Sequence, residues 1–198
     1  MSRKWLLALP GGLALALLTG PSPADDGEGK ATLDRAEAKK AADYLNRVRK
    51  EPAKFGKETG ADLSKVKPRP ALTWNAALAK AAEAKALDMA DRGYFDHVTP
   101  EGVGMNVQIN EAGYTLPASW VKDKRLNFFE SIAAGSNTGA AAIRGLVRDK
   151  GTAGAGHRKH LLGMSDFYAG CTDIGVGFAR NPRSKYRSYI CILVARKK

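Results

Sequence analysis

The sequence predicts a domain of the α+β class, and three observations support this class. Helix-forming residues with apolar side chains at helical spacing occupy most of the first two thirds of the chain. Two strand-like segments, rich in β-branched and aromatic residues, follow near its end. Long irregular segments separate the predicted helices, and the 198 residues suit one domain with a short extension. Helices first and strands last are typical of α+β domains.

The first 24 residues have the pattern of a secretory signal peptide. Arg3 and Lys4 give a positive start, the apolar run "WLLALPGGLALALLTG" follows, and "SPA" supplies small residues for cleavage after Ala24. An uncleaved membrane anchor is the alternative, but the run is short for a bilayer span of about 20 residues. We therefore expect export to the periplasm or the extracellular space. The expected organisation is a flexible segment at 25–32, a domain at 33–198 and no later membrane span.

Two helices are predicted in the first half of the domain. Residues 33–50 place apolar side chains at helical spacing, and a proline then ends the pattern. An extended connector with two prolines, "KVKPRPAL", comes next. Residues 73–93 carry the strongest helical pattern of the chain, with Thr73 or Asn75 as a cap and Gly93 as a stop.

The middle of the chain is predicted to combine loops with shorter helices. Residues 94–102, "YFDHVTPEG", form an irregular loop that carries His97, and residues 105–113 form a short helix. Residues 116–135 mix loop with a buried apolar piece, whereas residues 137–151 form an alanine-rich helix.

The last third of the chain predicts two neighbouring strands and a disulfide. Residues 169–180 and 185–196 are strand-like, and "NPRS" between them suits a turn. Cys171 and Cys191 are the two cysteines of the chain, one at each strand. An even pair in an exported protein favours a structural bridge over free thiols, and nothing around either cysteine indicates a catalytic thiolate.

The chain is strongly basic, with a formal net charge of +12. Its basic clusters are scattered along the chain, as in "RVRK", "KVKPR", "HRKH" and "RNPRSKYRS". A basic exported protein is attracted to anionic lipid surfaces and cell-envelope polymers, although simple solubility explains the charge equally well. No nucleic-acid-binding motif is present, and the export signal also argues against a nucleic-acid partner.

The three histidines and two acids are the candidate functional residues. The stretch "GHRKHLLG" holds His157, which opens a short helix, and His160. Together with His97, His157 offers imidazoles from distant segments for metal binding or acid–base chemistry. Such a pair needs carboxylates to orient it, and Glu130, flanked by apolar residues, and Asp149 are the candidates.

Each candidate also has a purely structural explanation. Glu130 suits a local cap, and Asp149 suits a surface ion pair with Arg148 or Lys150. A helix would place His160 on the same side as His157, but its leucine neighbours favour an ordinary packing or surface role. The HxxH spacing alone therefore leaves the question open.

Several motifs, taken in order, resemble one known family. These are "LTWNAALAKAAEAKALDMADRGYFDHVTPEG", "NEAGY", "FFESIAAG", "GHRKHLL" and "GVGFA". Together they resemble the SCP domain of the cysteine-rich secretory protein, antigen 5 and pathogenesis-related (CAP) superfamily, in its cysteine-poor bacterial branch. The resemblance covers roughly residues 33–195. It implies a three-layer α-β-α sandwich with two histidines and two acids in a cleft.

The resemblance assigns the four cleft positions residue by residue. His97 in "FDH" and His157 in "GHR" match the two histidines, and Glu130 matches the first acid. The family usually has Gly-Glu-Asn where this chain has Phe-Glu-Ser. Asp149 matches the second acid, which is usually a glutamate, and Leu146 stands where many members have tryptophan. His160 stands where bacterial members often have asparagine.

Three functions follow as hypotheses. The first is a secreted, non-enzymatic binding module that holds a divalent metal, most plausibly Zn²⁺, through His97 and His157. Its affinity should fall below about pH 6 to 6.5, because imidazoles must lose protons to bind metal. The second is a metal-dependent hydrolase of peptides or cell-wall material, with Glu130 as general base. The third is a structural hydrogen-bond network that holds the cleft together.

Overall fold

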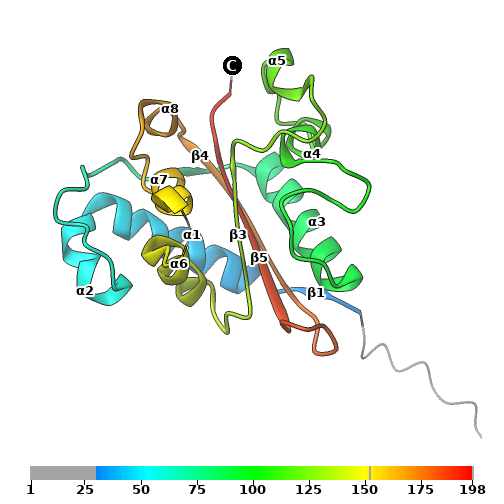
Figure 1. Ribbon diagram of the computed structural model, residues 1–198, viewed down its shortest axis with the longest axis horizontal. Coiled ribbons are helices and arrows are strands. Elements are labelled where there is room, and N and C mark those ends of the chain that lie inside the picture. Colours follow the sequence, from blue (N-terminus) through cyan, green and yellow to red (C-terminus); the bar gives the residue numbers. More distant parts are fainter. Residues whose placement is uncertain (1–29, 152, 198) are drawn as a thin grey trace, which may run out of the picture.

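Helices cover both faces of an antiparallel sheet in the computed structural model, which describes residues 30–151 and 153–197 (Figure 1). This arrangement confirms the predicted α+β class and the α-β-α sandwich. The predicted signal peptide, residues 1–24, lies outside the described residues. Among the described helices, none combines the length and the apolar character needed to cross a bilayer.

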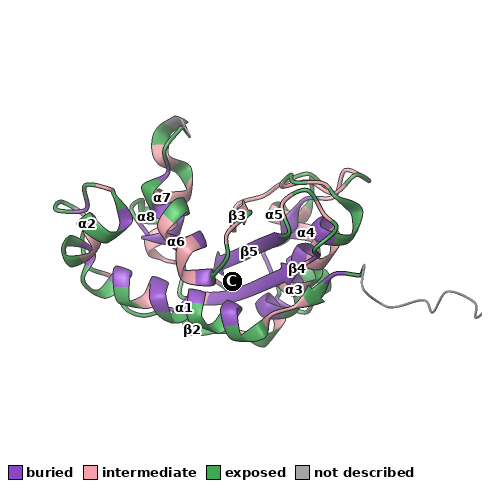
Figure 2. Ribbon diagram, turned by 90° about the horizontal axis from the view of Figure 1, so that it is seen from below, coloured by how far each residue is buried: buried purple, intermediate pink, exposed green. Residues whose placement is uncertain are grey.

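The sheet is built around the two C-terminal strands. Strand β4 (Asp173–Arg180) and strand β5 (Ser188–Ala195) pair antiparallel, as predicted. Strand β3 (Glu130–Ala134) pairs antiparallel with β5 and forms one edge. Strands β1 (Thr32–Leu33) and β2 (Thr73–Trp74) both pair with β4, β2 in parallel. Every residue of β5 is buried, because helices lie on both faces of the sheet (Figure 2).

One helical layer consists mainly of α3 (Ala76–Arg92), which packs on β4 and β5. The Asn75 side chain accepts from the backbone N–H groups of the first turn, and Gly93 ends the helix in the left-handed conformation, with φ of 70°. Two shorter helices follow, α4 (Met105–Glu111) and α5 (Ala118–Val121).

Two glycines of β4 bring α3 unusually close to the sheet. A Cβ atom built on Gly175 would lie 2.2 Å from the carbonyl carbon of Leu78, and one built on Gly177 would lie 2.2 Å from the carbonyl oxygen of Ala82. Any larger residue would therefore force the helix and the strand apart. The glycines in "DIGVGF" therefore occur at every second position because the backbone of α3 packs directly against this face of β4.

The other helical layer contains α1 (Arg35–Lys50) and α6 (Gly139–Arg148), which pack on each other and on the opposite face of the sheet. Asp34 caps α1 by accepting from the N–H of Glu37, so the helix begins two residues later than predicted. The remaining helices of this layer and its edge have these bounds: η1 Pro52–Phe55, α2 Gly56–Thr59, η2 Ala153–Ala155, α7 Gly156–Leu161 and α8 Asp166–Ala169.

Two secondary-structure predictions need correction. The predicted flexible segment 25–32 ends in ordered structure, because Ala31 is buried and Thr32 pairs with Arg180 in the sheet. The segment 116–135, predicted as loop with a buried apolar piece, contains strand β3 at its end. Its pattern "ESIAA" lacks β-branched residues except for one isoleucine, so pairing with β5 decides its conformation.

The predicted Cys171–Cys191 disulfide is wrong: both cysteines are free thiols, and both are buried. Cys191 lies on β5, and Cys171 lies two residues before the start of the neighbouring β4, but the register separates them. Cys191 pairs with Gly177, which is six positions along the chain from Cys171. At about 3.3 Å per strand residue the offset is about 20 Å, far beyond the Cα separation of about 7 Å that a disulfide permits.

Candidate functional site

His97 and Glu130 form the first of two histidine–carboxylate pairs. His97 lies in the loop that follows α3, and Glu130 is the first residue of β3. The Nδ1 atom of His97 lies 2.6 Å from Oε2 of Glu130. The carboxylate side chain is completely buried, whereas the imidazole is 42 % exposed. A buried carboxylate therefore holds a histidine that faces solvent.

Two further groups contact the carboxylate of Glu130. Asn127 Nδ2 donates to Oε2 over 3.4 Å, and the thiol of Cys191 donates to Oε1 over 3.4 Å. Both oxygens of Glu130 are thus engaged by protein groups. These contacts fix the orientation of the acid and, through it, the ring of His97.

His157 and Asp149 form the second pair. Asp149 ends α6 in the left-handed conformation, with φ of 51°, and His157 lies in the first turn of α7. Asp149 Oδ1 lies 2.8 Å from His157 Nδ1, and its Oδ2 accepts from the backbone N–H of Arg158. Residues in the left-handed conformation, including Gly151 and Gly154, reverse the direction of the chain between α6 and α7. The tight return brings the acid and the histidine together.

The two pairs come from opposite helical layers and meet beside β3, which lies between α7 and the α3 side in Figure 1. The ring centroids of His97 and His157 are 6.4 Å apart, with planes inclined by 35°. Both rings line a pocket of about 260 Å³. Its lining residues are His97, Asn127, Phe128, Glu130, Ser131, Gly156, His157, His160 and Tyr168. All four predicted cleft residues are therefore brought to one place.

His160 also lines the pocket but has a different environment. It is buried, with Nδ1 2.8 Å from Ser131 Oγ and Nε2 3.1 Å from the carbonyl oxygen of Val194. A carbonyl can only accept, so Nε2 carries the proton and Ser131 donates to Nδ1. Burial is the main cause that lowers the pKa of His160 to about 4; neighbouring cationic groups act in the same direction, and the hydrogen bond to Val194 opposes them. The two hydrogen bonds of this neutral ring connect α7 to strands β3 and β5.

The electrostatics of His97 differ from those of His160. The hydrogen bond to Glu130 raises the pKa of His97 above its ordinary value, although partial burial opposes this effect. Burial, together with the charge of Glu130, raises the pKa of the Cys191 thiol well above its usual range. Cys191 therefore acts as a neutral hydrogen-bond donor beneath the cleft.

A buried lysine on α3 completes this side of the site. Lys85 is fully buried, and its ammonium group donates to the hydroxyl of Tyr94 over 3.1 Å. Tyr94 in turn donates to Asp88. Sequence reasoning missed Lys85, although a signal existed, since it occupies the buried face of the helix between Leu78 and Met89.

Sequence reasoning also missed an aromatic pocket that adjoins the cleft. Trp120, Phe128, Phe167 and Tyr168 line a cavity of about 420 Å³, and Phe128 and Tyr168 also line the histidine pocket. The rings come from three separate segments of the chain, so no local pattern could have grouped them. Ser131, likewise, had no recognisable signal except its departure from the family motif.

The donor set of the cleft fits a divalent metal with few protein ligands. In both His97 and His157 the Nδ1 atom is hydrogen-bonded to a carboxylate. The two Nε2 atoms have no hydrogen bond within the described part of the chain. Metal-binding histidines commonly have this carboxylate partner on the other ring nitrogen. Within the described residues, no group of three or more His, Cys, Asp or Glu is placed to hold an ion. Water or a ligand would therefore supply the other coordination positions.

The sandwich, with paired histidines and acids at one sheet edge, defines a class of domain that comparisons with known proteins identify. A family model described as the cysteine-rich secretory protein family, CAP, matches residues 36–194, and the chain belongs to this family. A search of curated proteins found no match.

Two solved bacterial structures share the fold. One is an extracellular protein containing an SCP domain from Bacillus anthracis, with 22% identity and a TM-score of 0.54, aligned over 82% of this chain and 41% of that chain. The other is an outer surface protein from Borrelia burgdorferi, with 13% identity and a TM-score of 0.58, aligned over 86% of this chain and 99% of that chain. The present chain thus spans less than half of the Bacillus protein.

Proposed function

We propose that this CAP-domain protein is an exported, non-enzymatic binding module whose cleft binds a divalent metal, with Zn²⁺ preferred. One observation carries the proposal: a buried carboxylate engages Nδ1 of each partly exposed histidine, and both rings line one pocket. The pairing orients each imidazole and strengthens it as a ligand through Nε2. Imidazole nitrogen is a preferred ligand of Zn²⁺.

The residues of the cleft favour binding over hydrolysis. A general base must reach a water molecule, yet the side chain of Glu130 is completely buried and both of its oxygens contact protein groups. Asp149 is buried to the same degree and holds His157 and the N–H of Arg158. The carboxylates therefore serve to position the histidines. A metal bound here would supply a Lewis-acid centre with open positions for an anionic or neutral ligand.

Export supports a role at the cell envelope or outside the cell. The signal-peptide pattern of the sequence is the main support, and the two similar solved structures are described as extracellular and as an outer surface protein. The basic composition would favour contact with anionic envelope polymers or lipid surfaces.

Titration calorimetry with Zn²⁺ tests the proposal. The chain from residue 25 onward should bind one equivalent at pH 7.5, with much weaker binding at pH 5.5, because protons compete for the imidazoles. The double substitution His97→Ala and His157→Ala should abolish binding while the circular dichroism spectrum is retained. His160→Asn is the matched control, since it removes the third imidazole but leaves the pair. Full affinity in the double variant would rule out the cleft as the metal site.

A further inference from the structure

A further pocket, separate from the histidine and aromatic pockets, lies beside the loop that follows α7. The connector 65–70, "KVKPRP", runs past the loop between α7 and α8 and encloses a cavity of about 210 Å³. Its lining residues are Lys65, Val66, Lys67, Arg69, Leu162, Gly163, Met164 and Asp166. None of these residues lines the histidine pocket, so this cavity is separate from the proposed metal site.

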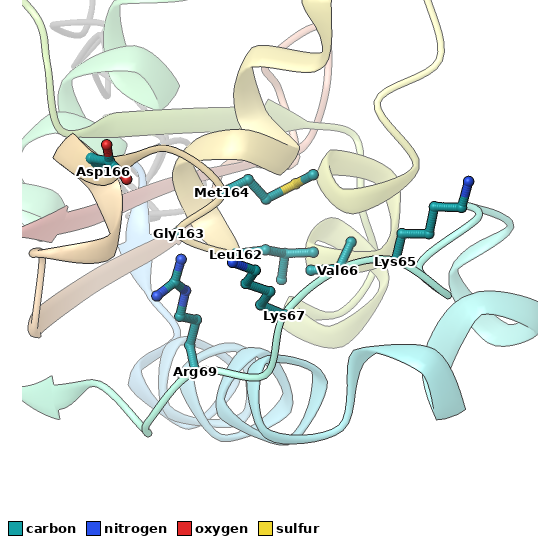
Figure 3. Close-up of a pocket in the computed structure, with 8 residues that line it drawn as sticks. All are labelled: Lys65, Val66, Lys67, Arg69, Leu162, Gly163, Met164 and Asp166. Carbon is teal, nitrogen blue, oxygen red and sulfur yellow. The ribbon is translucent and has the colours of Figure 1, made fainter.

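The pocket is rich in unpaired positive charge. Figure 3 shows Lys67 and Arg69 extending from the connector toward the loop at Leu162 and Gly163, while Lys65 extends outward at the far end. Within the described part of the chain, none of these three cations forms an ion pair. Asp166 is the acid in the lining, and it is exposed.

Arg69 carries the most specific signal. Its Nε–H group is buried and has no hydrogen-bond partner among the described residues. The backbone around it is held in place, because the N–H of Arg69 donates to the carbonyl oxygen of Arg49 over 2.8 Å and prolines flank it on both sides. A buried donor without a partner is unfavourable, so it marks a position where an acceptor belongs.

A second guanidinium group lies behind the same pocket. Arg49 is buried, donates to the carbonyl oxygens of Leu161 and Pro70, and reaches to within 3.4 Å of the Cβ position of Gly163. The pKa of Arg49 is lowered to about 10, first because of burial and then because the charge of Arg69 is close. Two like charges held together in a partly buried site repel each other unless an anion lies nearby.

We propose that this pocket, named here the connector pocket, binds the phosphate group of a phosphate monoester or diester. Guanidinium and ammonium groups together match a tetrahedral oxyanion, and arginine donates to it through several N–H groups at once. Val66, Leu162 and Met164 provide an apolar wall on which a short alkyl part of the ester can lie. The same phosphate chemistry occurs in soluble glycerol phosphates and in anionic phospholipid headgroups.

Binding of sn-glycerol 3-phosphate and inorganic phosphate at low ionic strength tests the connector pocket. EDTA is present throughout, so that any metal in the histidine cleft is removed and the outcome is independent of the proposed metal function. We expect saturable binding of one equivalent that is at least tenfold weaker in Arg69→Gln. The matched control is Arg183→Gln, which removes the same charge from an exposed position in the β4–β5 turn. Thermal unfolding of both variants checks the fold.

A second experiment, with lipid vesicles, distinguishes a phospholipid headgroup from a soluble phosphate ester as the ligand. Loss of binding to phosphatidylglycerol vesicles in Arg69→Gln, with binding retained in Arg183→Gln, identifies a lipid headgroup as the source. Binding of the soluble ester alone identifies a free or polymeric phosphate ester. The proposal is overturned if Arg69→Gln and Arg183→Gln weaken binding equally, since bulk charge would then explain it. Absence of binding in both experiments would overturn it as well.

Discussion

The Nδ1 atom of His97 lies 2.6 Å from Oε2 of Glu130, and the carboxylate is completely buried beneath the partly exposed ring. His157 and Asp149 repeat this relationship at 2.8 Å from the other helical layer. In each pair the carboxylate is buried and the imidazole is partly exposed to solvent. The cleft thus presents two oriented nitrogen ligands and no accessible carboxylate from either pair.

Glu130→Gln should lower the pKa of His97, because the hydrogen bond to the carboxylate is the main cause that raises it. Loss of the carboxylate partner should also weaken Zn²⁺ binding at pH 7.5 by about 10- to 100-fold. NMR titration of the imidazole signals measures the first effect, and calorimetry the second. Glu83→Gln, which removes a carboxylate from an ion pair with exposed Arg35, is the control. An unchanged pKa for His97 would contradict the assigned role of Glu130.

Asp149→Asn separates the charge of the second acid from its backbone role. Asparagine tolerates the left-handed conformation that Asp149 adopts, with φ of 51°. We expect the thermal midpoint to stay close to that of the parent protein, with Zn²⁺ affinity lower by about 10- to 100-fold. Asp149→Ala should lose the same affinity and in addition about 1 kcal/mol of stability, since alanine disfavours this conformation. If Asp149→Asn binds Zn²⁺ normally, His157 is oriented by other contacts.

Gly177→Ala should strongly destabilise the fold, by about 3 kcal/mol or more, because its Cβ would lie 2.2 Å from the backbone oxygen of Ala82. Gly145→Ala is the matched control within α6, where a Cβ meets nothing within 4 Å. That variant should gain about 0.5–1 kcal/mol, since alanine is the better helix former. Urea unfolding of both variants measures the difference. Similar stabilities would show that α3 can move away from β4 at little cost.

The sequence predicted the helices and the C-terminal strands well, because their patterns are local. The helix at 73–93 and strands β4 and β5 are confirmed with shifts of a few residues at their ends. Strand β3 was missed, since its alanine-rich segment becomes a strand only by pairing with β5. The disulfide was wrong for a related reason. The two strands were predicted as neighbours, but the register that separates Cys171 from Cys191 depends on the turn between them.

The candidate site was predictable from family motifs, whereas its supporting contacts were not. His97, Glu130, Asp149 and His157 converge as the resemblance implies. Two positions that depart from the family motifs, Ser131 and His160, are hydrogen-bonded to each other. A linear sequence shows each departure alone and gives no sign that the two side chains meet. The structure shows them as one contact between β3 and α7.

The burial of His160 should make the stability of the fold depend on pH. His160 has a pKa of about 4 in the fold, against about 6.5 in an unfolded chain. Between these values the unfolded state binds one more proton, so stability is present above pH 6.5 and is lost as the pH falls toward 4. The expected loss is about 3 kcal/mol across this window. His97 acts in a different window, because its raised pKa adds stability below pH 6.5 that is lost as the pH rises further.

His160→Asn therefore provides a decisive comparison. The variant should be less stable at pH 7.5, because it loses the hydrogen bonds to Ser131 and Val194 and some buried apolar surface. Its free energy of unfolding should nevertheless change little between pH 6.5 and 4.5, whereas the parent protein becomes markedly less stable. Urea unfolding at four pH values between 4.5 and 7.5 measures both slopes. Parallel slopes in the two proteins would mean that His160 is protonated in the fold, and that burial does not hold it neutral.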